Sequence, residues 1–409
     1  MPKLEKRIIF HIDVNNAFLS WTAVYLLKNG YKKDIRMIPS IIGGDEKTRR
    51  GIVLAKSPIA KKYKIVTAET IYSAKKKCKN LEIYPPNYKW YYEKSKELME
   101  YLSQYSPSQE QISIDECFLD MTGMNYIYHD IVELAYKIKN EVKLKFGYTV
   151  NIGIANNKLC AKMASDFEKP DRVHTLWEEE IKEKMWPLKV ERLYMCGKKT
   201  TIELNKLGIY TIEDLAKTDQ KLLEKNFKLQ GKYLHEAANG IDYSKVEKKK
   251  RKNSSISITE TLPYNYKDET KLKEMLFRQV EEVSRQLRNK NLYCKTIGVI
   301  FKNSSFISYS AQTTVSKETN STKEILEITY QLFENHYKKD EIRLIGVKLA
   351  GLSEKSFTQT SIFEKEEVET EDNSIQETID FLNNKFGKSL IKPASLKIIG
   401  ESKSKNKYK

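Results

Sequence analysis

The sequence predicts a multidomain protein of the α+β class. Strand and helix patterns alternate through the first 175 residues and then give way to a helical segment with glycine turns, 176–240. A basic run at 244–254 separates this part from a final segment that has the pattern of two helices and four strands. A chain of 409 residues is long enough for roughly two to four domains.

The first segment has the pattern of an antiparallel-rich sheet with helices packed on one face. Residues 7–14 form an apolar strand, and Asn16 to Leu27 follow with apolar residues at helical spacing. Pro85-Pro86 breaks the chain between two later helices. The other predicted elements are strands 35–42 and 51–56, helices 57–64, 72–78 and 91–105, an acidic hairpin at 112–121, helix 125–146, strand 149–155 and helix 158–167.

The helical segment contains two short glycine turns, which predict helix-hairpin-helix elements. Candidate DNA contacts in them are Gly197, Lys198, Lys199 and Gly208. Such turns bind phosphates through backbone amides and read no bases. The following run contains Lys248, Lys249, Lys250 and Arg251. A run of like charge is usually a solvated linker, and we expect this one to lie along phosphate as well. The last segment predicts strands 256–261, 294–302, 306–315 and 342–351 and helices 269–289 and 322–336.

Acidic residues interrupt two apolar strands of the first segment. Asp13 ends the first strand, and Asp115 and Glu116 lie inside the apolar run from Ile112 to Leu119. Neighbouring residues on a regular strand point to opposite faces, so both acids can serve one site only at a strand end, turn or bulge. Oxygen ligands of this kind suit Mg²⁺. Taken singly, each acid could also cap a helix or occupy an exposed turn.

The composition indicates a polyanionic partner. Lys and Arg number 72 against 55 Asp and Glu, a net charge of +17. Nucleic acid or an anionic membrane surface fits this excess. The five cysteines, at 78, 117, 160, 196 and 294, form no CxxC element, so we expect reduced, buried thiols in a cytoplasmic protein, and no zinc. No apolar run is long enough for a signal segment or a membrane span.

Residues 43–46, Gly-Gly-Asp-Glu, are also found on a hairpin of cyclic-dinucleotide synthases, which make product from GTP without DNA. Here the next residue is Lys47 rather than an aromatic residue. A basic hairpin loop is the better interpretation of this string.

Three motifs, in order and at matching spacing, resemble the Y-family, or translesion, DNA polymerases on their bacterial UmuC-like branch. The resemblance covers about residues 7 to 363. The motifs are Phe10-His11-Ile12-Asp13-Val14-Asn15-Asn16-Ala17-Phe18, Ser113-Ile114-Asp115-Glu116 and Gly153-Ile154-Ala155-Asn156-Asn157-Lys158-Leu159-Cys160-Ala161-Lys162-Met163-Ala164-Ser165-Asp166.

The resemblance implies a right-hand polymerase that copies damaged template with low fidelity and without proofreading, in DNA repair and SOS mutagenesis. Asp13, Asp115 and Glu116, with the Val14 carbonyl, would hold two Mg²⁺ ions. The domains would be a palm at 1–19 and 76–175, fingers at 20–75, a helix-hairpin-helix thumb at 176–241, a basic linker at 242–255, a little finger at 256–357 and a flexible tail at 358–409.

The same resemblance assigns contacts to the incoming deoxynucleoside triphosphate. Lys61 and Lys162 would meet its phosphates, although each could also be an ordinary surface lysine. Family members often carry a Tyr where this chain has Pro58, so the resemblance implies that Ser57 would partly stand in for that hydroxyl. Phe18, five residues after the first metal Asp, would be the steric gate against the ribose 2′-hydroxyl, or simply a core residue of the first helix.

The expected partners are primer-template DNA, deoxynucleoside triphosphates and a sliding clamp, with an accessory subunit as a further option and no membrane. Gln359, Ile362 and Phe363 match the bacterial clamp-binding peptide, a Gln, two spacers, an aliphatic and an aromatic residue. The alternative is that Ile362 and Phe363 pack onto the little finger. A second function class remains open, a non-catalytic DNA-binding scaffold that keeps the palm for structure.

Overall fold

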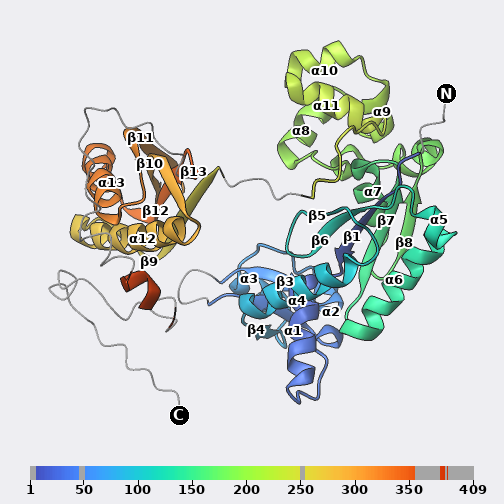
Figure 1. The fold of residues 1–409 in the computed structure, drawn as a ribbon, viewed down its shortest axis with the longest axis horizontal. Coiled ribbons are helices and arrows are strands. Elements are labelled where there is room, and N and C mark those ends of the chain that lie inside the picture. The colour runs from blue at the N-terminus through green and yellow to red at the C-terminus, as the bar shows by residue number, and fades with distance from the viewer. Residues whose placement is uncertain (1–5, 46–50, 249–253, 355–377, 383–384, 386–409) are drawn as a thin grey trace, which may run out of the picture. The chain divides into compact units, whose positions relative to one another are not determined.

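The computed structural model describes residues 6–45, 51–248, 254–354, 378–382 and 385. The described residues form two compact units, one ending at Lys248 and the other starting at Ser254 (Figure 1). Residues 359–363 and the basic residues Lys249, Lys250 and Arg251 lie outside the described part. No described helix is long and apolar enough to cross a membrane.

The first unit is built on a five-stranded sheet with β1 at its centre. The strand order is β5-β6-β1-β7-β8, with only β7 and β8 parallel. The bounds are β1 Ile9–Val14, β5 Gln109–Gln111, β6 Glu116–Asp120, β7 Val150–Ala155 and β8 Val173–Leu176. The predicted strands 7–14 and 149–155 are confirmed, whereas β8 was not predicted. β1 and β7 are buried along their whole length, which explains their apolar sequences.

Helices cover both faces of this sheet, not one face as the sequence predicted. Phe10 and Ile12 of β1 share a core with α4, Tyr88–Leu102, and α6, Ile131–Phe146. Ile9, on the opposite face, packs with α7, Lys158–Ser165. The predicted helix 125–146 is divided, because His129 has a positive φ of 35° between α5, Asn125–Tyr128, and α6.

Gly153 of β7 allows α7 to lie directly on the sheet. A Cβ added at Gly153 would lie 2.0 Å from the carbonyl oxygen of Ala161 and 2.4 Å from the backbone nitrogen of Ser165. Both atoms belong to the α7 backbone, which a rotamer change cannot move. Only glycine therefore fits at the centre of this strand.

We expect Gly153→Ala to destabilise the first unit by about 3 kcal/mol or more, because the new methyl group must push α7 off the sheet. The measurement is thermal unfolding together with the yield of soluble protein. Gly197→Ala is the matched control, since nothing lies within 4 Å of its added Cβ. Equal melting temperatures for the two variants would show that α7 moves freely on the sheet.

A smaller three-stranded sheet, in the order β3-β2-β4, forms the part of the first unit that we call the fingers part, residues 35–84. Its elements are η1 Ile35–Met37, β2 Ser40–Gly43, β3 Val53–Lys56, α2 Pro58–Lys62, α3 Ile71–Lys77 and β4 Glu82–Tyr84. The predicted strand 35–42 thus begins as a 3-10 turn. The expected boundary at residue 75 falls inside α3, and β4 pairs with β2 beyond it.

Helix α1, Ala17–Lys28, connects the two sheets of the first unit. Its Leu19 and Ala23 pack against Ile42 and Ala55 of the small sheet. Trp21 of the same helix belongs to the core of the large sheet. The helix that leaves the acidic end of β1 is therefore shared by both sheets.

Residues 178–238 are helical, as predicted. The elements are η3 Glu178–Glu180, η4 Ile181–Met185, η5 Val190–Arg192, α8 Lys198–Lys206, α9 Ile212–Lys217, α10 Gln220–Phe227 and α11 Leu229–Ala238. Thr211 begins α9 with a reciprocal capping box to Asp214. Gly208, with a φ of 78°, turns the chain between α8 and α9.

The beginning of the predicted linker 242–255 packs on the first unit instead of lying free. The Asp242 carboxylate accepts a hydrogen bond from the backbone of Leu159, at 3.1 Å. The backbone of Glu247 donates to Glu110 at 2.9 Å, and Lys158 pairs with the same carboxylate at 2.7 Å. The sequence could not indicate this docking, because it depends on Glu110 of the distant strand β5.

The second unit is a four-stranded antiparallel sheet, in the order β11-β10-β12-β9, with two helices packed on it and on each other (Figure 1). Its helices α12, Glu269–Asn289, and α13, Thr322–His336, have the predicted bounds. Its strands are β9 Ser255–Tyr266, β10 Leu292–Asn303, β11 Ser308–Thr319 and β12 Ile342–Ala350, and the short β13, Ser353–Glu354, pairs with β10. Residues 378–382, within the predicted flexible tail, form a helical turn.

Candidate active site

The three predicted carboxylates come from the same end of two neighbouring strands. Asp13 of β1 lies directly opposite Glu116 of β6 in the antiparallel register. Asp115 occupies the turn just before β6, and its carbonyl accepts a hydrogen bond from the Val14 nitrogen at 3.0 Å. The Ser113 hydroxyl donates to the Asp115 carboxylate at 2.6 Å. The prediction that these acids occupy a strand end and the adjoining turn is therefore confirmed, and their role in metal binding stays a prediction.

The side chains of alternate β1 residues place the site on the α7 face of the sheet. Ile9, His11 and Asp13 share that face because side chains alternate along a strand. Lys162 of α7 reaches across to Glu116, with Nζ 2.9 Å from Oε1, and is only 9% exposed. Its ammonium group also lies over the ring of Tyr194 at 5.5 Å. The alternative of an ordinary surface lysine is wrong for Lys162.

Lys169 was not found by sequence reasoning. Its Nζ lies 3.0 Å from Oδ1 of Asp13 and 2.7 Å from Oδ1 of Asp166. Burial of Asp13, which is 7% exposed, makes this charge partner important. In the sequence Lys169 is one of 72 basic residues, so neither composition nor periodicity could single it out.

Two buried asparagines hold the loop that carries Lys169. The Asn151 side chain donates to the carbonyls of Ser165 and Glu168, at 3.0 and 2.7 Å. The Asn15 carboxamide accepts from the backbone nitrogen of Asp171 at 2.9 Å and donates to Asn151 at 3.0 Å. This network explains why polar residues occupy buried positions on β7 and just after β1, since each of their polar groups must be hydrogen-bonded.

His11 is fully buried and lies beside Glu116. Its Nδ1 is hydrogen-bonded to the Ser165 hydroxyl at 2.8 Å, and its Nε2 lies 3.8 Å from Oε2 of Glu116. Burial lowers the pKa of His11, which favours the neutral imidazole. His11, followed by Asp13 and by the hydrogen bond from Lys162, holds the pKa of Glu116 well below its usual range. At 3.8 Å the imidazole contact is longer than a hydrogen bond, so it acts through its dipole.

Burial raises the pKa of Asp13 to about 7, and the nearby Glu116 adds to this effect while Lys169 opposes it. The two facing carboxylates therefore differ, with Glu116 ionised and Asp13 close to its titration point at neutral pH. Burial and a nearby like charge both disfavour the ionised form of a carboxyl group and so raise its pKa. A site of this kind gains from any cation that binds both groups.

The donor chemistry of the site fits a hard divalent cation. All its candidate ligands are oxygens, from Asp13, Asp115, Glu116 and the Val14 carbonyl, and Mg²⁺ prefers such ligands. Among the residues that the structure describes, no three His, Cys, Asp or Glu side chains form a ready metal-binding group. Instead, Lys162 and Lys169 each pair with one carboxylate, and these two ammonium groups supply the countercharge in this structure.

Phe18 lies in the first turn of α1 and is half-buried. Its ring stacks on Tyr91 of α4, with centroids 4.8 Å apart and planes 14° from parallel. Tyr88 meets it edge-on at 6.3 Å. The Tyr91 hydroxyl is 2.6 Å from that of Thr22, which in turn donates to the Phe18 carbonyl at 2.7 Å. The Phe18 ring is therefore packed against Tyr91 on one side and still partly exposed, which is the arrangement expected of a steric gate.

Ser57 and Lys61 have different surroundings. Ser57 is fully buried and begins α2, its hydroxyl accepting from the Ala60 nitrogen at 2.9 Å and donating to the Ile38 carbonyl at 2.7 Å. The expectation that this hydroxyl replaces the missing tyrosine contact is therefore wrong, because both its hydrogen-bonding functions are used within the fold. Lys61, on the same helix, is exposed and faces no such constraint.

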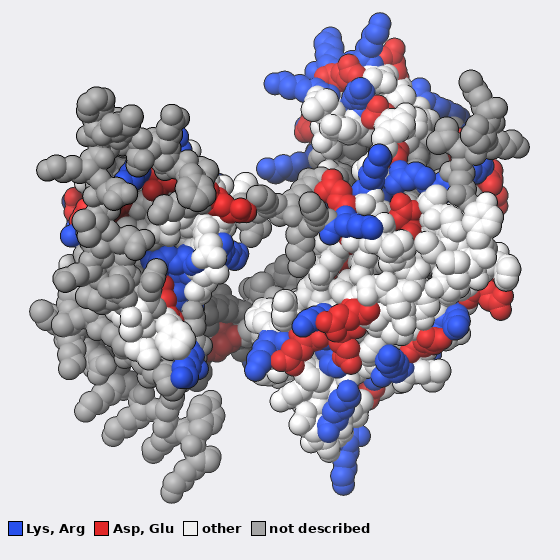
Figure 2. Space-filling model, viewed as in Figure 1, with Lys and Arg blue, Asp and Glu red and all other residues white. Residues whose placement is uncertain are grey.

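The predicted DNA contacts of the helical part are at its surface. Gly197 is the N-cap of α8 and is exposed, as are Lys198 and Lys199. Figure 2 shows blue lysine side chains gathered around α8 and α10 in this part. Lys248, the last described residue before the gap, is also exposed. Exposed amides and lysines around a glycine turn suit phosphate binding.

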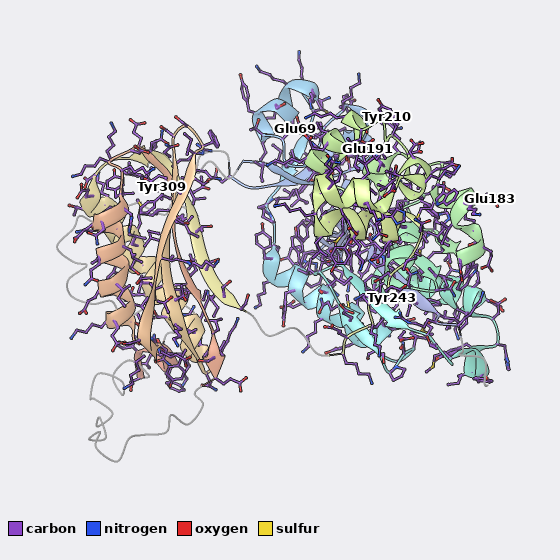
Figure 3. The ribbon with its side chains drawn as sticks, turned by 90° about the horizontal axis from the view of Figure 1, so that it is seen from above. Glu69, Glu183, Glu191, Tyr210, Tyr243 and Tyr309 are labelled. Atoms are coloured by element: carbon purple, nitrogen blue, oxygen red, sulfur yellow. The ribbon has the colours of Figure 1, made fainter. Side chains whose placement is uncertain are left out.

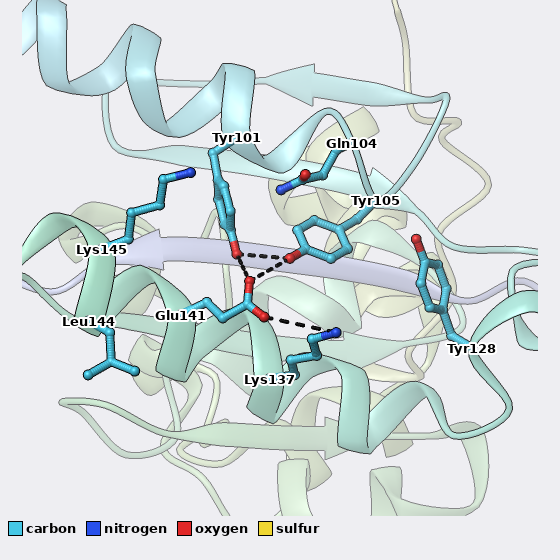
Figure 4. Close-up of a pocket in the computed structure, with 8 residues that line it drawn as sticks. All are labelled: Tyr101, Gln104, Tyr105, Tyr128, Lys137, Glu141, Leu144 and Lys145. Atoms are coloured by element: carbon cyan, nitrogen blue, oxygen red, sulfur yellow. Dashed lines mark hydrogen bonds and ion pairs between the residues drawn. The ribbon is translucent and has the colours of Figure 1, made fainter.

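A cavity also lies away from this site. It has a volume of about 710 Å³ and is lined by residues of α4, α5 and α6 and the turn after α4 (Figure 4). Glu141 accepts hydrogen bonds there from Tyr101 at 2.5 Å and Tyr105 at 3.0 Å. These helices cover the face of the sheet opposite α7, so the cavity contains none of the candidate site residues. Figure 3 shows how the side chains of each unit surround its ribbon.

Comparisons with known proteins found matches in sequence and in fold over most of the chain. The model of the impB/mucB/samB family matches residues 12–166, and the model of that family's C-terminal domain matches 253–362. "DNA polymerase IV" of Clostridium acetobutylicum is 43% identical over 94% of this chain and 97% of its own. "DNA polymerase IV 1" of Bacillus subtilis is 31% identical over 98% of this chain and 96% of its own. A solved Y-family DNA polymerase chimera has the same fold, with a TM-score of 0.71 at 24% identity over 84% of this chain and 98% of its own.

Proposed function

The chain belongs to the Y family of DNA polymerases, the impB/mucB/samB family, and we propose that its acidic strand ends catalyse template-directed addition of deoxynucleotides to a primer 3′-hydroxyl. The observation that carries this proposal is the register of β1 and β6, which sets Asp13 opposite Glu116 with Asp115 in the adjoining turn. A scaffold protein has no physical reason to keep buried acids in such a position.

Asp13, Asp115, Glu116 and the Val14 carbonyl are the proposed ligands of two Mg²⁺ ions. When bound, such ions favour deprotonation of the primer hydroxyl and neutralise the triphosphate and the leaving pyrophosphate. His11, held by Ser165, orients the Glu116 carboxylate. Lys162 and Lys169 place two ammonium groups where negative charge develops on the phosphates, and Lys61 adds a third from α2.

Synthesis across damaged template is consistent with the small size of the fingers part. Its two α-helices have five and seven residues, and its strands have three or four. A pocket closed by such short elements selects weakly between correct and altered bases, because few contacts differ between them. The helix-hairpin-helix residues Gly197, Lys198, Lys199 and Gly208 and the basic residues Lys248, Lys249, Lys250 and Arg251 are the proposed phosphate contacts.

Primer extension by the full chain, with Mg²⁺ and then with excess chelator, tests the proposed function. We expect template-dependent extension that requires the metal and all four deoxynucleotides. DNA binding without extension under any metal condition would favour the scaffold. Formation of a cyclic dinucleotide from GTP in the absence of DNA would favour the synthase suggested by residues 43–46.

Clamp binding is a separate prediction for the peptide Gln359–Phe363, which lies outside the described residues. Replacing Ile362 and Phe363 by Ala should abolish clamp-stimulated extension and leave the slow clamp-independent reaction unchanged, because a few apolar anchors carry such interactions and tethering raises local concentration. Thr360→Ala with Ser361→Ala is the matched control at the two spacer positions. Loss of basal activity would indicate packing on the little finger, and full clamp binding would contradict the prediction.

A further inference from the structure

The outer surface of the fingers part carries a strong positive charge, of which the proposed chemistry uses only Lys61. Residues 57–81 contain seven lysines and a single acid, Glu69. The lysines are Lys61, Lys62, Lys64, Lys75, Lys76, Lys77 and Lys79, and all seven are exposed. The positive charges of so dense a cluster repel one another, and a polyanionic ligand would relieve this repulsion.

The one acid of this segment is already engaged within the fold. Glu69 accepts from Lys77 at 2.6 Å, from the Ser73 hydroxyl at 2.8 Å and from the Val66 nitrogen at 2.8 Å. These bonds tie the start of α3 to the loop before it and lower the pKa of Glu69. Glu69 lies beside the pale blue helices of this part in Figure 3. It neutralises Lys77, and the described structure gives no carboxylate partner to Lys61, Lys62, Lys64, Lys76 or Lys79.

Exposed aromatic rings lie among these lysines. Tyr72 on the first turn of α3 is 65% exposed, and Tyr63 at the end of α2 is 46% exposed. The Nζ atom of Lys76, one turn after Tyr72, lies over the Tyr72 ring at 4.5 Å from its centroid. Val66 between the two helices is 53% exposed. We call the exposed side chains of Tyr63, Val66, Tyr72, Lys76 and the neighbouring lysines the fingers surface.

The fingers surface is connected to the acidic strand ends by short contacts. Asn16, three residues after Asp13, donates from its side chain to the carbonyl of Lys56 at 2.6 Å. Lys56 ends β3, and its Nζ donates to the Thr67 hydroxyl at 3.1 Å. Both bonds lie within the first unit. The acidic strand ends are therefore connected through Asn16 and Lys56 to the loop at 66–69, which leads into α3.

We propose that the fingers surface binds the single-stranded template ahead of the primer terminus, with bases stacked on Tyr72 and Tyr63 and phosphates on the surrounding lysines. Exposed rings interleaved with lysines match single-stranded nucleic acid, because stacking needs bases that are free of a duplex and lysines track the backbone. A duplex would present only its phosphates to these rings. This inference rests on the proposed polymerase function and names a further contact for its template.

The test compares two primer-templates with the same duplex and a template 5′ overhang of either one nucleotide or about twelve, long enough for a typical single-strand site. Dissociation constants come from fluorescence anisotropy with the full chain. Tyr72→Ala combined with Lys76→Ala should weaken binding of the long-overhang DNA about tenfold, the size of one lost base stack, and change the short-overhang DNA less than about twofold. A long overhang of abasic sugar-phosphate keeps the phosphate contacts and lacks the stacks, so it should bind the unaltered chain more weakly than the normal long overhang.

Tyr92→Ala combined with Lys96→Ala is the matched control, because it removes a tyrosine and a lysine at the same spacing from the exposed face of α4, where Tyr92 is 67% exposed. It should leave both dissociation constants unchanged. Single-nucleotide extension on the short-overhang DNA is measured for every variant, so failure of the polymerase function would appear there and not in the overhang comparison. Equal weakening of both DNAs by the Tyr72 and Lys76 variant, or an abasic overhang that binds as well as the normal one, would overturn the proposal.

Discussion

Replacing Glu116 by Gln is expected to lower primer extension by roughly three orders of magnitude, which corresponds to about 4 kcal/mol of transition-state stabilisation. Glu116 is the proposed metal ligand whose charge is held most firmly, because His11 and Lys162 keep its pKa low. Gln has the same shape and can still accept from Lys162, so the loss would come from charge and not from packing. Single-turnover extension with saturating DNA measures the effect.

Asp13→Asn and Asp115→Asn should show losses of similar size with DNA affinity preserved. Asp120→Asn is the control, since Asp120 is the last residue of β6, at the end of the strand away from Glu116, and caps the Thr122 nitrogen at 3.0 Å. A variant of Asp13, Asp115 or Glu116 that extends primers at nearly the normal rate would remove that residue from the metal site. An equal loss in the Asp120 variant would point to damage of the strand.

Phe18→Ala should raise ribonucleotide insertion relative to deoxyribonucleotide insertion by about 10²-fold. A bulky side chain rejects an added hydroxyl by a clash that disappears with the ring, and contacts of this size discriminate by about 1–3 kcal/mol. The stack of Phe18 on the fully buried Tyr91 prevents the ring from moving aside. The ratio of kcat/KM values for matched ribo- and deoxyribonucleoside triphosphates measures the change.

Tyr91→Phe distinguishes the contribution of the Tyr91 ring from that of the Tyr91 hydroxyl in the same experiment. It keeps the platform under Phe18 and removes only the hydroxyl bonded to Thr22 at 2.6 Å, so the sugar ratio should stay within about twofold of normal. A folded Phe18→Ala variant with an unchanged ratio would place the sugar gate elsewhere. A variant that unfolds instead would support the alternative that Phe18 is a core residue, and Phe18→Leu would then be measured.

Local sequence rules were enough for the elements whose limits depend on their own residues. Helices α12 and α13 have the predicted bounds, and each begins at a side-chain cap, Asp268 and Ser321. The acids that interrupt apolar strands indicated a site at strand ends, because a buried carboxylate costs too much elsewhere. The structure agrees, with Asp13 and Glu116 facing each other across β1 and β6.

Contacts between residues far apart in the chain were decided only by the tertiary structure. Lys169 meets Asp13 across 156 residues and Lys162 meets Glu116 across 46, so no periodic pattern could pair them. The close packing of α7 on the sheet depends on Gly153, whose missing side chain matters only once the Ala161 carbonyl lies against it. Ser57 is a further case, because its burial and its hydrogen bond to the Ile38 carbonyl, 19 residues away, exclude the predicted nucleotide contact. Charge, capping and alternation are local and can be read in order along the chain, whereas ion pairs and close approaches exist only after distant segments have packed.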